Sequence, residues 1–271
     1  ECGGISIKPD GEYIAEIYVS EKGYADHEIY MDVEGGHSAY PPLHTSITRL
    51  AKAVYDLEEK RMPARLCAPV VQEMKARASF IDEKYRTLFE NPLESEDILK
   101  QLAEEDPLIN TMMRTTTTPT MCKGSDQANI LPEHASITTN SRILPTETIE
   151  DLENHFQDVL PEGVRFQRIK GHNPPAVSST ESYGYRLLEG IMQKMYPGIR
   201  MIPCMMACGT DSRYYSDLSP SKSVYRFTGI LYNGKSGGAH SLNEHIDTGV
   251  LVNNVKFYVE LFKNYGKEIA E

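Results

Sequence analysis

The stretch Gly35-Gly36-His37-Ser38-Ala39-Tyr40-Pro41-Pro42 closes one alternating strand, residues 24–33, and precedes one amphipathic helix, residues 45–60. The two glycines free the backbone at the turn, and the two prolines prevent the helix from beginning early. His37 is left on an exposed loop tip, where binding and catalytic groups concentrate, although a loop histidine is more often simply solvated. A histidine there can donate a hydrogen bond or carry a proton near neutral pH.

Outward from this stretch, hydrophobic periodicity predicts a compact sheet with two helices. The expected order is strand, helix, an irregular helical segment at 62–108, two strands, helix and strand. The last four of these are predicted at residues 111–122, 135–144, 146–160 and 164–169, with Thr146 as the cap of the helix. This order is the split βαβ, ferredoxin-like arrangement, with both helices on one face.

A second, smaller set of elements flanks that sheet and predicts part of an α/β layered domain. Strands at 5–7 and 13–19 precede that sheet in the chain. After a predicted hinge at residues 171–175 come helices at 180–196 and 247–267 and strands at 199–206 and 224–231. A sheet with so few strands has uncovered edges and one uncovered face. We therefore expect these elements to be part of a larger domain. The expected domains are 1–22, 23–172 and 173–271.

Composition excludes several classes of function. The formal net charge of the 271-residue chain is −11, which argues against a nucleic-acid surface. No apolar run is long enough to span a bilayer and no signal peptide is visible, so a cytoplasmic location is expected. The cysteines are expected to be reduced thiols, with Cys204 and Cys208 in a buried strand.

Three further segments carry candidate functional groups, each with an ordinary structural alternative. In residues 209–215, Asp211 can orient a neighbour and Arg213 offers a planar fork to a carboxylate, although a plain strand-to-helix turn would use the same residues. His240 lies in a second glycine-flanked loop, with Glu244 as a candidate partner for a metal ligand. Asn129 lies in a polar loop, where an asparagine normally just forms a turn.

Taken in order, these segments resemble the M20 family of metallopeptidases, especially its carboxypeptidase S and aminoacylase-like branch. The matching stretches span essentially the whole chain: Glu1-Cys2-Gly3-Gly4, Glu21-Lys22-Gly23-Tyr24, Gly35 to Pro42, Asn129-Ile130-Leu131-Pro132, Gly209-Thr210-Asp211-Ser212-Arg213 and His240-Ser241-Leu242-Asn243-Glu244. The resemblance implies an α/β fold: the C-terminal part of a phosphorylase/hydrolase-like catalytic domain with an inserted ferredoxin-like α+β lid domain.

The resemblance also implies roles for individual residues. His37 would reach the active site of a partner subunit and stabilise the oxygen on which charge develops, with Asn129 as its companion in substrate binding. Arg213 would grip the free carboxylate of the substrate. Glu1 and His240 would be metal ligands, although Cys2 stands where the branch usually has glutamate in Asp-Glu-Gly-Gly, which leaves the register of Glu1 open by one residue.

The implied activity is metal-dependent hydrolysis of an amide bond in a small peptide or N-acyl amino acid, by a homodimer formed through the lid. Two divalent metal ions would be required; zinc is the implied metal, and cobalt or manganese would also suit carboxylate-rich sites.

The His-x-Asp motif of the family, its bridging aspartate and its Glu-Glu pair would all precede residue 1. The chain alone is therefore expected to be inactive. The alternative is a non-catalytic dimerisation or binding module, or a family member without metal. The helical segment 62–108 has no predicted function.

Overall fold

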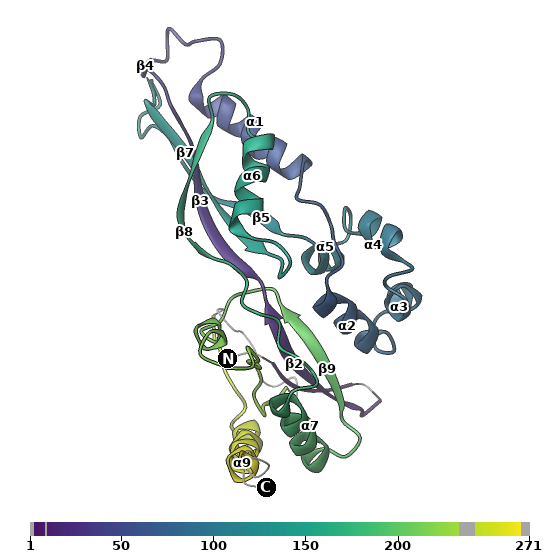
Figure 1. Ribbon diagram of the computed structural model, residues 1–271. Coiled ribbons are helices and arrows are strands. Elements are labelled where there is room, and N and C mark those ends of the chain that lie inside the picture. The colour runs from purple at the N-terminus through teal and green to yellow at the C-terminus, as the bar shows by residue number, and fades with distance from the viewer. Residues whose placement is uncertain (1–2, 9, 233–241, 267–271) are drawn as a thin grey trace.

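The computed structural model describes residues 3–8, 10–232 and 242–266, and its main feature is a pair of four-stranded sheets joined end to end (Figure 1). We call them the base sheet and the lid sheet. The chain passes from one to the other where β2 ends at Glu21 and β3 begins at Gly23.

The base sheet has the strand order β10-β1-β2-β9. Its strands are β1 (Gly4–Ile7), β2 (Tyr13–Glu21), β9 (Arg200–Met206) and β10 (Leu231–Tyr232). One face packs against α7 (Tyr183–Met195) and α9 (Thr248–Asn264), with Ile5, Ile17 and Phe257 in the shared core. On the other face, Ile14 and Ile202 pack against Phe80 and the helix that precedes it.

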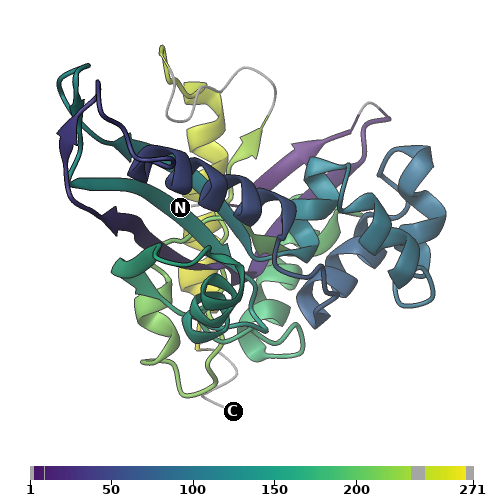
Figure 2. The same ribbon diagram turned by 90° about the horizontal axis from the view of Figure 1, so that it is seen from above.

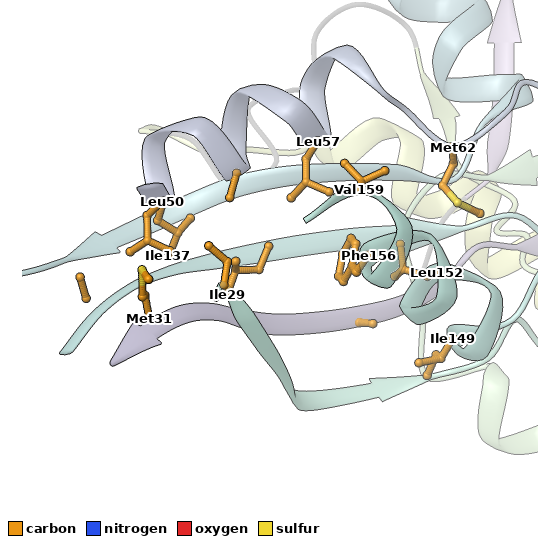
Figure 3. Packing of buried hydrophobic residues seen from close by; sticks show 14 of the residues in the cluster. Ile29, Met31, Leu50, Leu57, Met62, Ile137, Ile149, Leu152, Phe156 and Val159 are labelled. Atoms are coloured by element: carbon orange, nitrogen blue, oxygen red, sulfur yellow. The ribbon is translucent and has the colours of Figure 1, made fainter. Parts of the chain in front are cut away.

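The lid sheet is antiparallel throughout, with the order β5-β7-β3-β8. Its strands are β3 (Gly23–Asp32), β5 (Thr116–Lys123), β7 (His134–Ile143) and β8 (Arg165–His172). Helices α1 (Ser46–Glu59) and α6 (Ile149–Val159) cover one face, where Ile29, Leu50 and Phe156 meet in a dry core (Figure 3). The predicted ferredoxin-like order of elements is confirmed.

Four helices fill the segment between α1 and β5: α2 (Ala68–Arg77), α3 (Glu83–Glu90), α4 (Glu96–Leu102) and α5 (Pro107–Met113). They share their own core around Phe89, Leu99 and Met113 and lie to one side of the lid sheet (Figure 2). The sequence predicted an irregular helical segment at 62–108 and a strand from residue 111; the strand is wrong for 111–113, which belong to α5. Asp106 accepts hydrogen bonds from the amides of Leu108 and Ile109, and Pro107 occupies the first turn, so a helix begins here.

Two other local predictions are corrected. The cap of α6 is Thr148, not Thr146, because Thr148 and Asp151 form a reciprocal capping box in which each side chain accepts from the other's amide. The predicted strand at 224–231 reduces to β10 at its end. The amide and carbonyl of Val224 bond to the Ser178 hydroxyl group, both at 2.8 Å, instead of joining a strand ladder.

Lys22 marks the junction of the two sheets and is completely buried. Its ammonium group donates a hydrogen bond of 2.7 Å to the carbonyl of Arg114, which follows α5, so it ties the helical segment to the junction. Desolvation by burial lowers the pKa of Lys22 to about 8.

The thiol prediction holds for Cys67, Cys122, Cys204 and Cys208, which are all free, whereas Cys2 lies outside the described residues. Cys208 is exposed, not buried, because β9 ends at Met206. Within the described part of the chain, no helix combines the length and apolar character that crossing a bilayer needs.

Candidate functional site

The Gly-Gly-His turn forms a small two-stranded sheet at the far end of the lid (Figure 1). Strand β4 (Gly36–His37) pairs with β6 (Ile130–Leu131), so that His37 lies opposite Ile130. The amide of Ser38 donates to the carbonyl of Asn129 at 2.9 Å. The structure therefore brings His37 and Asn129 together, although 92 positions separate them in the sequence. We call β4, β6 and residues 38–45 the lid tip.

The close pairing of these strands explains the first glycine of the turn. A Cβ atom on Gly35 would lie 2.7 Å from Cγ of Glu133 and 3.0 Å from the carbonyl oxygen of Leu131. Any side chain at this position would push β4 away from β6 and displace the histidine that follows.

The ring of His37 is held in one tautomer. Its Nδ1 accepts a hydrogen bond from the amide of Ala39 at 3.0 Å, so the proton of the neutral ring is on Nε2. The side chain is exposed, and Nε2 has no partner among the residues that the structure describes. His37 therefore presents an N–H donor to whatever approaches the lid tip.

A second group of polar side chains lies at the opposite end of β3, beside the junction of the sheets. A hollow of about 450 Å³ is lined by Tyr24, Arg142, Lys170, Gly171, His172, Gly209 and Arg213. We call it the basic hollow. Three of its side chains are cations at neutral pH and none of its lining residues is acidic, so it suits an anion.

The two guanidinium groups of the basic hollow have neutral partners. Arg142 lies over the ring of Tyr24, 4.7 Å from its centroid, and donates to the Asn140 side chain. Arg213 donates to the carbonyl of Thr210 and the hydroxyl of Tyr214. Neither forms an ion pair with a carboxylate in the described parts of the chain, whereas Lys170 pairs with Asp26 at 3.4 Å.

Sequence reasoning found Arg213 and missed Arg142, Lys170 and His172. Residues 142, 170 and 172 lie on strands β7 and β8, where an outward polar or charged residue carries no distinguishing signal. The pairing of β3 with both strands places Arg142 and His172 on either side of Tyr24.

A buried ion pair holds the loop that carries Arg213. The carboxylate of Glu21 accepts from Nε of Arg226 at 2.8 Å, and from the amide and hydroxyl of Thr210 at 3.1 and 2.7 Å. Both charged side chains are almost fully excluded from solvent. Thr210 is thereby tied to the end of β2, which fixes where the 209–213 loop leaves β9.

The remaining predicted site residues are placed as follows. Asp211 lies in the same loop, where its carbonyl accepts from the amide of Tyr214. Glu244 is exposed before α9. Glu1 and His240 lie outside the described residues, so their predicted roles as metal ligands are not tested. Within residues 3–8, 10–232 and 242–266, no three or more His, Cys, Asp or Glu side chains gather to hold a metal ion.

One chain does not bring His37, at the lid tip, and Arg213, in the basic hollow, together. The basic hollow adjoins the first residues of β3 and the lid tip lies beyond its last, and a ten-residue strand spans roughly 30 Å. An extended dipeptide is only about 7 Å long. Both groups can contact one small substrate only if they come from different chains.

Beside the lid tip, His134 gives a test of the local electrostatics. Its Nδ1 lies 2.7 Å from Oδ1 of Asp32, and this hydrogen bond raises the pKa of the imidazole above its usual 6.5. The folded state then binds this proton more tightly than the unfolded chain. Its contribution to stability is complete below pH 6.5 and is lost as the pH rises through the folded pKa.

We expect the His134 resonance in an NMR titration to have its midpoint above 6.5, and Asp32→Asn to lower that midpoint. Asp126→Asn, which changes an exposed carboxylate without a bond to His134, is the control. An unchanged midpoint in Asp32→Asn would contradict the assigned cause.

Comparison with known proteins adds three findings. A family model described as a peptidase dimerisation domain matches residues 19–165. An N-fatty-acyl-amino acid synthase/hydrolase of Danio rerio is 32% identical over 93% of this chain and 50% of its own length. A probable carboxypeptidase S-like protein of Dictyostelium discoideum is 30% identical over 94% of this chain and 49% of its own. The chain thus spans about half the length of these curated relatives.

Solved structures share the fold. An M20 family metallo-carboxypeptidase from Sulfolobus solfataricus superposes with a TM-score of 0.63 at 19% identity, covering 97% of this chain and 62% of that one. Human carnosine dipeptidase 1 superposes with a TM-score of 0.58 at 14% identity, covering 91% and 56%. At these identities the likeness concerns fold alone, and it confirms the predicted fold class.

Proposed function

Because the chain belongs to the M20 peptidase family, we propose that it forms part of a hydrolase that cleaves an amide bond in a peptide or N-acyl amino acid with a free carboxylate. The names of its relatives, carboxypeptidase S-like and N-fatty-acyl-amino acid synthase/hydrolase, support this substrate class. The observation that carries the proposal is the basic hollow, whose two guanidinium groups lack carboxylate partners among the described residues.

In this proposal, Arg213 and Arg142 bind the substrate carboxylate. A guanidinium group can donate two parallel hydrogen bonds to a carboxylate, which fixes its orientation as well as its position. Asp211 and the buried pair of Glu21 and Arg226 support the loop.

The scissile carbonyl receives its hydrogen bond from a second copy of the chain. Nε2–H of His37 donates to the oxygen as negative charge develops on it, and Asn129 assists at the lid tip. The homodimer this requires is supported by the match to a peptidase dimerisation domain.

Metallopeptidases of this family use divalent metal ions, and we propose two, of zinc, with Glu1 and His240 among the ligands. Bound metal would polarise the carbonyl and activate water. The described residues do not provide such a site, so their part is confined to binding, orientation and the hydrogen bond from His37. We accordingly assign the activity to a longer polypeptide that contains this chain, with this segment inactive alone.

The carboxylate role is tested by Arg142→Met and Arg213→Met in that longer polypeptide. A hydrogen bond to a charged group contributes about 1.5–3 kcal/mol, so each change should lower kcat/KM about 10- to 150-fold for a free acid. For the C-terminal amide of the same substrate, the same variants should lower kcat/KM much less. Arg168→Met, on the lid surface, is the control, and an unchanged acid-to-amide ratio in both hollow variants would refute the role.

A second candidate is a dimerisation or binding module without catalysis. The family model that matches is itself a dimerisation domain, which favours this alternative. A longer polypeptide that is dimeric, retains no divalent metal and hydrolyses no N-acyl amino acid would establish it in place of the hydrolase.

A further inference from the structure

The lid tip exposes apolar side chains directly after the histidine. Tyr40 is 88% exposed and Leu43 is 99% exposed, with Pro41 and Pro42 between them. Ile130, which pairs with His37 across the small sheet, is half exposed. Single exposed apolar residues are common, but a contiguous group next to a polar functional group indicates a binding surface.

This apolar group is held in a defined position relative to His37. The amide of Tyr40 donates to the carbonyl of His37 at 3.0 Å. Two consecutive prolines restrict the backbone that follows, and Thr45 caps α1 immediately afterwards. Because directly opposed residues in antiparallel strands project to the same side, Ile130 lies beside the His37 ring. Such a surface can bind with little loss of conformational entropy.

We propose that Tyr40, Leu43 and Ile130 contact the acyl chain of an N-acyl amino acid bound at the partner subunit. The inference rests on the proposed function, since it takes His37 as donor to the scissile carbonyl. The carbonyl carbon is the first atom of the acyl group, so the chain begins where His37 binds. The carboxylate end of the substrate points into the basic hollow, whose cations exclude an apolar chain. The acyl chain therefore extends along the lid tip.

The apolar character of the lid tip favours an acyl chain over a peptide as the group that binds there. A peptide substrate would place polar amide groups along the same path, and the segment from Tyr40 to Leu43 offers them few hydrogen-bonding side chains. Each methylene group of an apolar chain that is buried there should raise kcat/KM roughly fourfold. The enzyme should consequently prefer long acyl chains to acetyl.

The test is a series of acetyl, hexanoyl and dodecanoyl derivatives of one amino acid, assayed with the full-length dimer. Tyr40→Ser combined with Leu43→Ser should reduce the preference for dodecanoyl over acetyl about tenfold or more. Leu93→Ser, which changes an exposed leucine in the helical segment, is the control and should keep the preference.

Two outcomes would overturn the inference. One is a loss that is equal for all three substrates or absent. The other is dissociation to monomers by size-exclusion chromatography with parallel loss of all activity, which would make this surface a subunit contact. His37→Ala separates this inference from the proposed function: if it abolishes turnover while the serine variants keep the chain-length preference, only the acyl contact fails.

Discussion

His37→Ala is expected to lower the turnover of the full-length dimer about 100- to 1000-fold, because it removes one preorganised donor to the developing oxyanion. The side chain is exposed and its only hydrogen bond among the described residues is local, with the amide of Ala39. Folding and dimerisation should therefore be unaffected. Steady-state kinetics with an N-acyl amino acid, together with size-exclusion chromatography, measure both.

The same variant tests whether the donor acts across the dimer. His37→Ala and Arg213→Ala each strongly impair every site of their own homodimer, but a heterodimer of the two holds one site with both residues intact. Random reassortment should restore about one quarter of the wild-type activity, since half of the dimers are mixed and each has one good site.

No restoration on mixing, with exchange of subunits demonstrated, would place His37 in the site of its own chain. His44→Ala, which removes a second exposed histidine from the same loop, is the matched control for the single variant. Equal losses in His37→Ala and His44→Ala would show a general effect on the loop and would reject His37 as the specific donor.

Arg226→Met is expected to destabilise the fold by about 3–5 kcal/mol, since it leaves the carboxylate of Glu21 buried without its counter-charge. Among the residues that the structure describes, one oxygen of Glu21 and one terminal nitrogen of Arg226 have no hydrogen-bond partner, so no other group there replaces the lost charge. The effect is measured as the free energy of unfolding in urea.

Two comparisons make this result specific. Glu21→Gln combined with Arg226→Met removes both charges and should recover much of the lost stability. Arg200→Met breaks the exposed pair of Arg200 with Glu12 and should cost at most about 1 kcal/mol. If Arg226→Met costs no more than Arg200→Met, the buried pair does not hold the loop of Thr210.

Local patterns in the sequence predicted most of the elements. The alternation that indicated a strand at 24–33 corresponds to β3, and the three- and four-residue spacing at 45–60 corresponds to α1 with Thr45 as its cap. These signals involve residues within one or two turns of each other, which is why they can be read without a structure. Errors arose where polar residues decided the outcome, as Asp106 does at the start of α5.

The candidate site was predictable only in part. The glycines and prolines around His37 mark its turn in the sequence, whereas Asn129 was a candidate only because its segment resembles one of the M20 family. Arg142 carries no such mark, and its place in the basic hollow depends on the pairing of β3 with β7 and on the end of β9. Glu21 and Arg226 are 205 positions apart and meet only when the base sheet forms.

The sequence by itself determined the strands and helices, through their hydrophobic periodicity, and also the turns and the exposed histidine. Steric and hydrophobic preferences of this kind act between neighbouring residues. Only the tertiary structure decided that the lid tip and the basic hollow lie at opposite ends of one long strand. That separation is the length of β3, a distance no small substrate spans. It is the physical reason for proposing that a complete site needs two copies of the chain.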